Sequence, residues 1–166
     1  MSNYLNILKY AMDREKEGQK FFQDNSKRFS NPVSRALFEK LAGLELEHYN
    51  FLKEQFDHYL SNNSLKPLDD KIMSRQEDLF VKRENSEKIQ LSLTQSDVPD
   101  VSIMRMAYLI EKDFAEFYKD AAEKSEDEEG KRLFNMLSNW ELAHEALFKK
   151  EYNRLMEEYM NLPWGG

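Results

Sequence analysis

Six side chains of this sequence have types and spacings suited to binding metal ions. They are four glutamates and two histidines: Glu15, Glu45, His48, Glu111, Glu141 and His144. Each histidine follows a glutamate by three residues, so on a helix the carboxylate and the imidazole share one face and can reach the same ion. Carboxylate and imidazole ligands suit iron or manganese, and zinc would also accept them. Because the sequence contains no cysteine, thiolate sites and thiol redox chemistry are excluded.

The surroundings of these six residues are apolar at helical spacing. Glu15, for example, shares a face with Leu8, Ala11 and Phe22, whereas the neighbouring charged residues fall on other sides of the helix. All six side chains are therefore predicted to point into a core. Buried carboxylates close together repel one another and are costly to desolvate, so cations must accompany them. Two divalent ions would balance four carboxylates with both histidines neutral.

The apolar pattern that positions these residues predicts four amphipathic helices in one domain spanning residues 1–166. We expect a hairpin at about 2–60, a long crossover at about 61–100, a second hairpin at about 101–162 and a short tail at 163–166. The tight turns are predicted around Ser30-Asn31-Pro32 and at 125–130. The crossover is long enough for the second and third long helices to run parallel. A short helix is expected inside it, around Ile72 to Phe80.

The second half of the chain repeats the first. At an offset of 96 residues, positions 8–52 align with 104–148 without a gap, and 11 of the 45 pairs are identical. Three of the identical pairs join the six candidate ligands. Glu15 and Glu45 lie equally far from the first turn, and Glu111 and Glu141 equally far from the second, so all four carboxylates are predicted to meet near the middle of the bundle.

Composition limits the other functions. A chain of 166 residues with 40% hydrophobic content can build one sizeable core, and the net charge of −7 argues against a nucleic-acid partner. No run of about 18 apolar residues predicts a membrane span. The N-terminal residues lack the order of a secretory signal, so a cytoplasmic protein is expected.

The segments AMDREKEGQKFF and LAGLELEH, together with AYLIEKDFAEFY and LSNWELAH, resemble the rubrerythrin branch of the ferritin-like diiron proteins. The resemblance covers both hairpins and implies an all-α, ferritin-like four-helix bundle. In that family one Glu from each of two helices and Glu-x-x-His from each of the other two bind two irons. Carried over residue by residue, these ligands are the six residues above. Glu45 and Glu141 would be the bridging carboxylates.

The sequence departs from the family pattern at three points. Rubrerythrins usually carry a rubredoxin-like cysteine domain, so we expect electrons to come from a separate, rubredoxin-like partner. They also tend to have a carboxylate where this chain has Phe114 and a tyrosine where it has Phe22. Tyr118 remains as a candidate hydrogen-bonding group beside the ligands.

Three functions follow as hypotheses. The first is an oxidoreductase in which two Fe(II) ions reduce peroxide or dioxygen. The second is a ferroxidase or iron-handling protein, and the third is a helical scaffold or partner-binding module in which metal is structural or absent. Duplication alone could also repeat the Glu-x-x-His spacing without function, which is the main objection to a metal site.

Three further residues are interpreted without metal binding. His58 has no counterpart in the second half and is expected on the surface near the end of its helix. Trp140 is interpreted as a helix-packing or subunit-contact residue rather than an electron-transfer group. Trp164, in the Pro-Gly tail, is a candidate for docking on a neighbouring chain. We expect a homodimer or a higher homo-oligomer.

Overall fold

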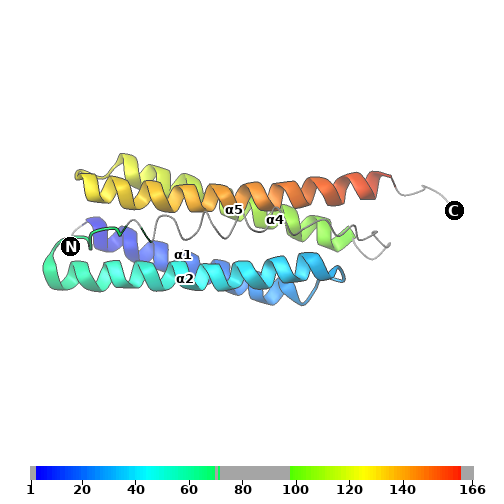
Figure 1. Ribbon diagram of the computed structural model, residues 1–166, viewed down its shortest axis with the longest axis horizontal. Helices are drawn as coiled ribbons and strands as arrows, with labels where there is room; N and C mark the ends of the chain where they lie inside the picture. Colours follow the sequence, from blue (N-terminus) through cyan, green and yellow to red (C-terminus); the bar gives the residue numbers. More distant parts are fainter. Residues whose placement is uncertain (1–2, 70, 72–97, 162–166) are drawn as a thin grey trace.

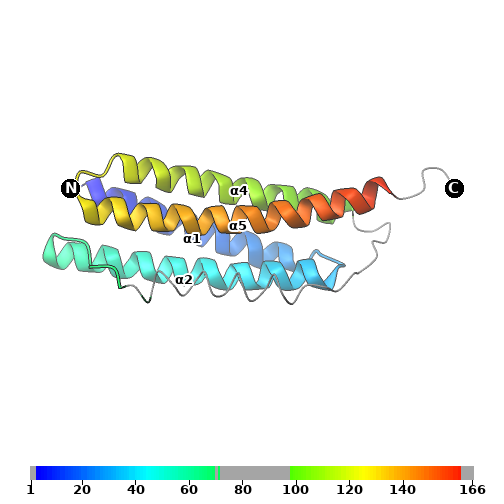
Figure 2. The same ribbon diagram turned by 45° about the horizontal axis from the view of Figure 1, so that its top comes forward.

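The computed structural model describes residues 3–69, 71 and 98–161, which form four long α-helices. The helices are α1 (Asn3–Ser26), α2 (Pro32–Asn62), α4 (Val98–Glu123) and α5 (Glu128–Met160). Helices α1 and α2 form one antiparallel hairpin and α4 and α5 the other, and the two hairpins lie side by side in an elongated bundle (Figure 1). Helices α2 and α4 run in the same direction (Figure 2). The predicted ferritin-like four-helix bundle is confirmed.

Equivalent caps begin the second helix of each hairpin. The Oδ1 atom of Asn31 accepts hydrogen bonds from the backbone N–H groups of Val33 and Ser34 at 2.9 and 3.4 Å, and Pro32 occupies the first turn. Asp127 accepts from Gly130 N–H at 2.7 Å in the same way. These side chains satisfy backbone donors that lack helical partners. The two caps are 96 residues apart, so the repeat extends to the turns.

The end of α2 and the first residues after it are held by the side chain of Gln55. Its Oε1 accepts from the backbone N–H of Lys66 at 2.9 Å, and its Nε2 donates to the Lys66 carbonyl at 3.2 Å. The His58 ring contacts the Ser64 carbonyl through Nδ1 at 2.8 Å, so this half-buried histidine has a structural role. The expected helix at 72–80 and the Trp164 tail lie outside the described residues.

One boundary differs from prediction. Residues 98–100 were expected to end the crossover, but they form the first turn of α4. Proline is tolerated in a first turn because the N–H that it lacks would have no helical partner there. Pro99 is therefore compatible with a helix start.

The core consists of two apolar clusters, each with members from all four helices. One cluster contains Leu8, Leu52, Tyr118, Phe134 and Leu137 among others, and the second contains Phe22, Phe38, Leu41, Met104 and Phe148 among others. Along every helix, the six candidate ligands fall between residues of the first cluster and residues of the second. The six residues therefore lie at one level of the bundle, as predicted, with one apolar cluster on either side.

Candidate metal centre

The six predicted ligands are gathered in the interior, and we refer to them as the ligand cluster. Its members are Glu15 on α1, Glu45 and His48 on α2, Glu111 on α4, and Glu141 and His144 on α5. Every one of these side chains is at most 1% exposed. The prediction that all six point into the core is confirmed. Residue types that are rarely buried without partners are here packed together.

The two histidines connect the carboxylates. His48 Nδ1 lies 3.1 Å from Glu141 Oε1 and 3.4 Å from Glu15 Oε2. His144 Nδ1 lies 3.3 Å from Glu141 Oε2, 3.5 Å from Glu45 Oε1 and 3.7 Å from Glu111 Oε2. The imidazole rings stack on each other with centroids 5.3 Å apart. All four helices therefore contribute to one continuous polar site.

Within this site the donor atoms fall into two overlapping groups, each of which could hold a metal ion. In each group the atoms lie within 4.8 Å of one another; the groups are Glu45, Glu111, Glu141 and His144, and Glu15, His48 and Glu141. Glu141 belongs to both, which is the placement expected of a bridging carboxylate. Glu45 belongs to one group only, so its bridging role stays a prediction.

Most oxygens of the ligand cluster accept no hydrogen bond. Glu45, Glu111 and Glu141 each have both carboxylate oxygens buried without a donor at bonding geometry, and Glu15 has one, Oε2. An unpaired buried acceptor costs roughly 1–3 kcal/mol, and more when it is charged. Seven such oxygens around two imidazoles form a set that fits two hard or borderline cations. The residues present therefore match a diiron-type site.

Proximity and burial shift the pKa values within the cluster. Burial raises the pKa of Glu45 well above its usual value, and the nearby Glu15 and Glu141 raise it further; Glu111 is raised by burial and by Glu45 and Glu141. Burial alone would lower the pKa of His48 and His144, but the adjacent carboxylates outweigh it and raise both. Burial would raise the pKa of Glu141, yet the two histidines lower it.

These directions describe how the cluster balances its own charge. Without metal, the raised pKa values favour protons on His48, His144, Glu45 and Glu111, and the lowered pKa of Glu141 favours its ionised form. A divalent cation must displace such protons to bind. Metal binding and proton release are therefore coupled at this site.

Tyr118 lies beside the cluster, as predicted. Its hydroxyl donates to Oε1 of Glu15, and the ring is 1% exposed. Burial, followed by the charges of Glu15 and Glu141, raises the pKa of this phenol well above its ordinary value. Tyr118 therefore stays protonated and available as a donor.

Gly18 and Phe114 close the site between α1 and α4. A Cβ atom at Gly18 would lie 3.3 Å from Phe114 Cε2 and 3.4 Å from Glu45 Oε2, so a side chain here would press on both. The guanidinium of Arg14 lies over the Phe114 ring, 5.2 Å from its centroid. Phe114 therefore contacts the region of Gly18 and Glu45 and also the guanidinium of the partly exposed Arg14.

Trp140 has a closer relation to the site than the sequence indicated. Its ring stacks on His48 with centroids 5.1 Å apart and an interplanar angle of 22°, and it is 9% exposed. It thereby fixes the plane of an imidazole that faces the carboxylates. Helix packing was predicted, but the partner was not, because Trp140 and His48 lie on different helices far apart in sequence.

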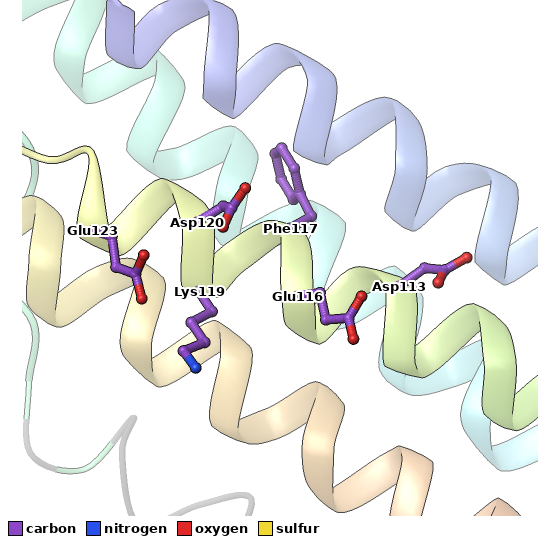
Figure 3. Close-up of a pocket in the computed structure, with 6 residues that line it drawn as sticks. All are labelled: Asp113, Glu116, Phe117, Lys119, Asp120 and Glu123. Atoms are coloured by element: carbon purple, nitrogen blue, oxygen red, sulfur yellow. The ribbon is translucent and has the colours of Figure 1, made fainter.

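A second group of carboxylates lies on the outer surface of α4 (Figure 3). A shallow groove there is lined by Asp113, Glu116, Phe117, Lys119, Asp120 and Glu123. Its acidic side chains are exposed, and Lys112 and Lys124 lie 3.9 and 3.5 Å from Glu116 and Asp120. This is a solvated charged face rather than a second metal site.

Comparison with known proteins bears on the family and on the fold. The family model described as Rubrerythrin matches residues 6–152. A solved structure of a hypothetical protein from Pyrococcus furiosus is 20% identical, with a TM-score of 0.66 over 93% of this chain and 91% of that one, and it supports the fold alone. No curated protein matches. Among the described helices, none combines the length and apolar character needed to span a bilayer.

Proposed function

Because this chain belongs to the rubrerythrin family, whose members bind iron and are typically oxidoreductases, we propose that it is a diiron oxidoreductase. Its ligand cluster would hold two iron ions, and its substrate would be peroxide or dioxygen. The supporting observation is the set of seven buried carboxylate oxygens that accept no hydrogen bond. Four carboxylates would be neutralised by two divalent ions, which removes the cost of burying the charges.

Each residue of the cluster has a part in this proposal. Glu45, Glu111 and His144 would serve one ion, and Glu15 and His48 would serve the other. Glu141 would contact both. Bound iron would supply the one-electron redox steps that protein side chains cannot perform. Manganese or zinc could occupy the same donors, but zinc would support no redox reaction.

The surrounding residues would exclude water from the ligand cluster and hold its side chains in place. The apolar clusters above and below exclude water, which strengthens the electrostatic interactions between ligands and cations. Trp140 holds the His48 ring, and the Tyr118 hydroxyl holds one oxygen of Glu15. Reducing equivalents would come from a donor outside the described residues, and a separate rubredoxin-like protein is the partner that we propose.

Anaerobic loading with ferrous iron tests the proposal. The metal content per chain is measured first, and the optical spectrum is then followed as peroxide or air-saturated buffer is added. Two irons per chain, oxidised faster by peroxide than by air, would support peroxide as the substrate. Glu116→Gln, on the outer face of α4, is the matched control and should load and react as the unaltered protein does.

Other outcomes would assign another function. Many irons retained per chain after oxidation would indicate iron handling, and two ions that never change oxidation state would indicate a structural metal. A chain that binds no ferrous iron, zinc or manganese would contradict the proposal altogether.

A further inference from the structure

The two halves of the ligand cluster are not equivalent, although the internal repeat makes their ligands identical. Seven residues after Glu15 comes Phe22, whereas seven residues after Glu111 comes Tyr118. Both aromatic residues are buried, and the two positions are 96 residues apart, so they are equivalent in the repeat. One half of the chain thus supplies a hydroxyl where the other supplies a hydrogen atom.

That hydroxyl is used on one side only. Tyr118, on α4, donates to Oε1 of Glu15 on α1, which leaves Oε2 facing the site at 3.4 Å from His48 Nδ1. Glu111 has no such donor, since neither of its oxygens accepts a hydrogen bond. Its Oε2 lies 3.7 Å from His144 Nδ1. One oxygen of Glu15 is therefore shared with a phenol, whereas neither oxygen of Glu111 accepts a hydrogen bond.

The residue in the equivalent place cannot compensate. The Phe22 ring packs among other aromatic rings, with its centroid 5.3 Å from that of Phe148 and 5.4 Å from that of Phe38. It has no polar atom to restrain a carboxylate. The asymmetry is therefore built from side-chain chemistry at two positions, on a backbone arrangement that the repeat makes alike.

We infer that Tyr118 is a positioning residue that makes the two metal positions of this chain inequivalent. Its hydrogen bond favours binding of a cation by Glu15 through Oε2, while Glu111 is left able to bind through one oxygen or both. The position served by Glu111 and His144 is the one whose coordination can change, and the position served by Glu15 and His48 is held fixed. This inference rests on the proposed function, because it requires two bound ions.

Four proteins test it: the unaltered chain, Tyr118→Phe, Phe22→Tyr and, as a matched control, Tyr10→Phe. Tyr10 lies on α1 with its side chain 49% exposed, outside the ligand cluster. Each protein is loaded anaerobically with isotopically enriched ferrous iron, its iron content is measured, and its Mössbauer spectrum is recorded. The spectrum reports the coordination of each ion separately and does not depend on turnover.

The unaltered chain is expected to show two ferrous signals of equal area with different quadrupole splittings. Tyr118→Phe should shift one signal toward the other and leave the second in place, because it frees Oε1 of Glu15. Phe22→Tyr adds a hydroxyl at the equivalent place and should shift the signal that Tyr118→Phe leaves unchanged. Tyr10→Phe should give the unaltered spectrum.

The failures are distinguishable. Two irons per chain that give a single signal in the unaltered protein would overturn the inference and leave the proposed function standing. The inference is likewise overturned if Tyr118→Phe shifts both signals equally. Fewer than two irons per unaltered chain would overturn both. If Tyr118→Phe fails to fold, Phe22→Tyr still decides, since an unshifted pair of signals in that variant contradicts the inference.

Discussion

Helix α4 carries acidic residues on two faces that behave differently. On the inner face Glu111 is fully buried beside Glu45 and Glu141, and its oxygens accept no hydrogen bond. On the outer face Glu116 is exposed to solvent (Figure 3). The Lys112 ammonium lies 3.9 Å from its Oε1. The residue type and the helix are the same. Only the surroundings differ.

The difference shows that burial and mutual proximity give an ordinary carboxylate the surroundings of a candidate metal ligand. Burial raises the pKa of Glu111 well above its usual value, and Glu45 and Glu141 add repulsion. An exposed ion pair like that of Glu116 contributes only about 0–1 kcal/mol to stability. Substitutions on the inner face should therefore change metal binding, stability and pH dependence, and substitutions on the outer face should change little.

Glu141→Ala should produce the largest effect. Glu141 contacts both histidines, at 3.1 and 3.3 Å, and belongs to both groups of donor atoms. Breaking a buried charged network costs about 3–5 kcal/mol of stability. Paired metal binding should be lost as well, as measured by metal content per chain and by denaturant unfolding.

Glu116→Ala is the matched control for that substitution. It should bind two ions and should unfold within about 0.5 kcal/mol of the unaltered chain, the range typical of surface substitutions. If Glu116→Ala lost as much metal binding and stability as Glu141→Ala, buried and exposed carboxylates would not differ in the way described.

Removing the metal should have the next largest effect. A ligand present at 1,000 times its dissociation constant stabilises a protein by about 4 kcal/mol. For a chain of this size that corresponds to a fall in melting temperature of roughly 8–16 °C on chelation. Calorimetry with and without chelator measures it. An unmoved melting curve would show that the buried carboxylates do not need cations.

The stability of the metal-free chain should fall as the pH rises from acidic to mildly alkaline values. The pKa values of His48, His144, Glu45 and Glu111 are all raised, so the folded chain binds these protons more tightly than the unfolded one. Their contribution is complete below the unfolded pKa values and is lost as pH rises through the folded ones. For the histidines the loss begins near their ordinary value of 6.5.

The chelated protein should therefore melt at a lower temperature at about pH 8 than at about pH 6. Each tenfold tightening of proton binding by a titrating group corresponds to ~1.4 kcal/mol. The metal-loaded protein should show no such fall, because its ligands are already deprotonated and metal affinity rises with pH. The lowered pKa of Glu141 acts only under acidic conditions, outside this window. If the melting temperatures of the chelated and metal-loaded proteins changed equally between pH 6 and pH 8, the pKa shifts described for the cluster would be contradicted.

The smallest predicted effect compares two helical glycines. Gly43 on α2 is exposed and nothing lies within 4 Å of a Cβ added there, so Gly43→Ala should stabilise the helix by about 0.5–1 kcal/mol. Gly18→Ala gains the same helical preference but must displace Phe114 or Glu45, so we expect a net loss of about 1 kcal/mol. Denaturant unfolding of both variants measures the change in the free energy of unfolding, which should be positive for Gly43→Ala and negative for Gly18→Ala. A gain at Gly18 would show that α1 and α4 pack less tightly there than described.

Much of the site could be predicted from the sequence because it is encoded in spacing. Helical periodicity gives the face of each residue, and the repeat gives the level at which Glu15, Glu45, Glu111 and Glu141 meet. The start of α4 at Val98, a few residues before the expected end of the crossover, was less well defined, because a proline such as Pro99 can either break a helix or begin one. The sequence does not distinguish these two roles.

The sequence by itself determined the hairpins, the caps and which side chains turn inward, since these depend on residues within a few turns of one another. Only the tertiary structure decided which groups meet across helices: Trp140 against His48, Phe114 against Gly18, and the Tyr118 hydroxyl on Glu15. Such contacts depend on the distance and rotation between packed helices, which residue spacing along one helix does not specify. For that reason the ligands are readable in the chain, whereas the inequivalence of their surroundings is visible only in the fold.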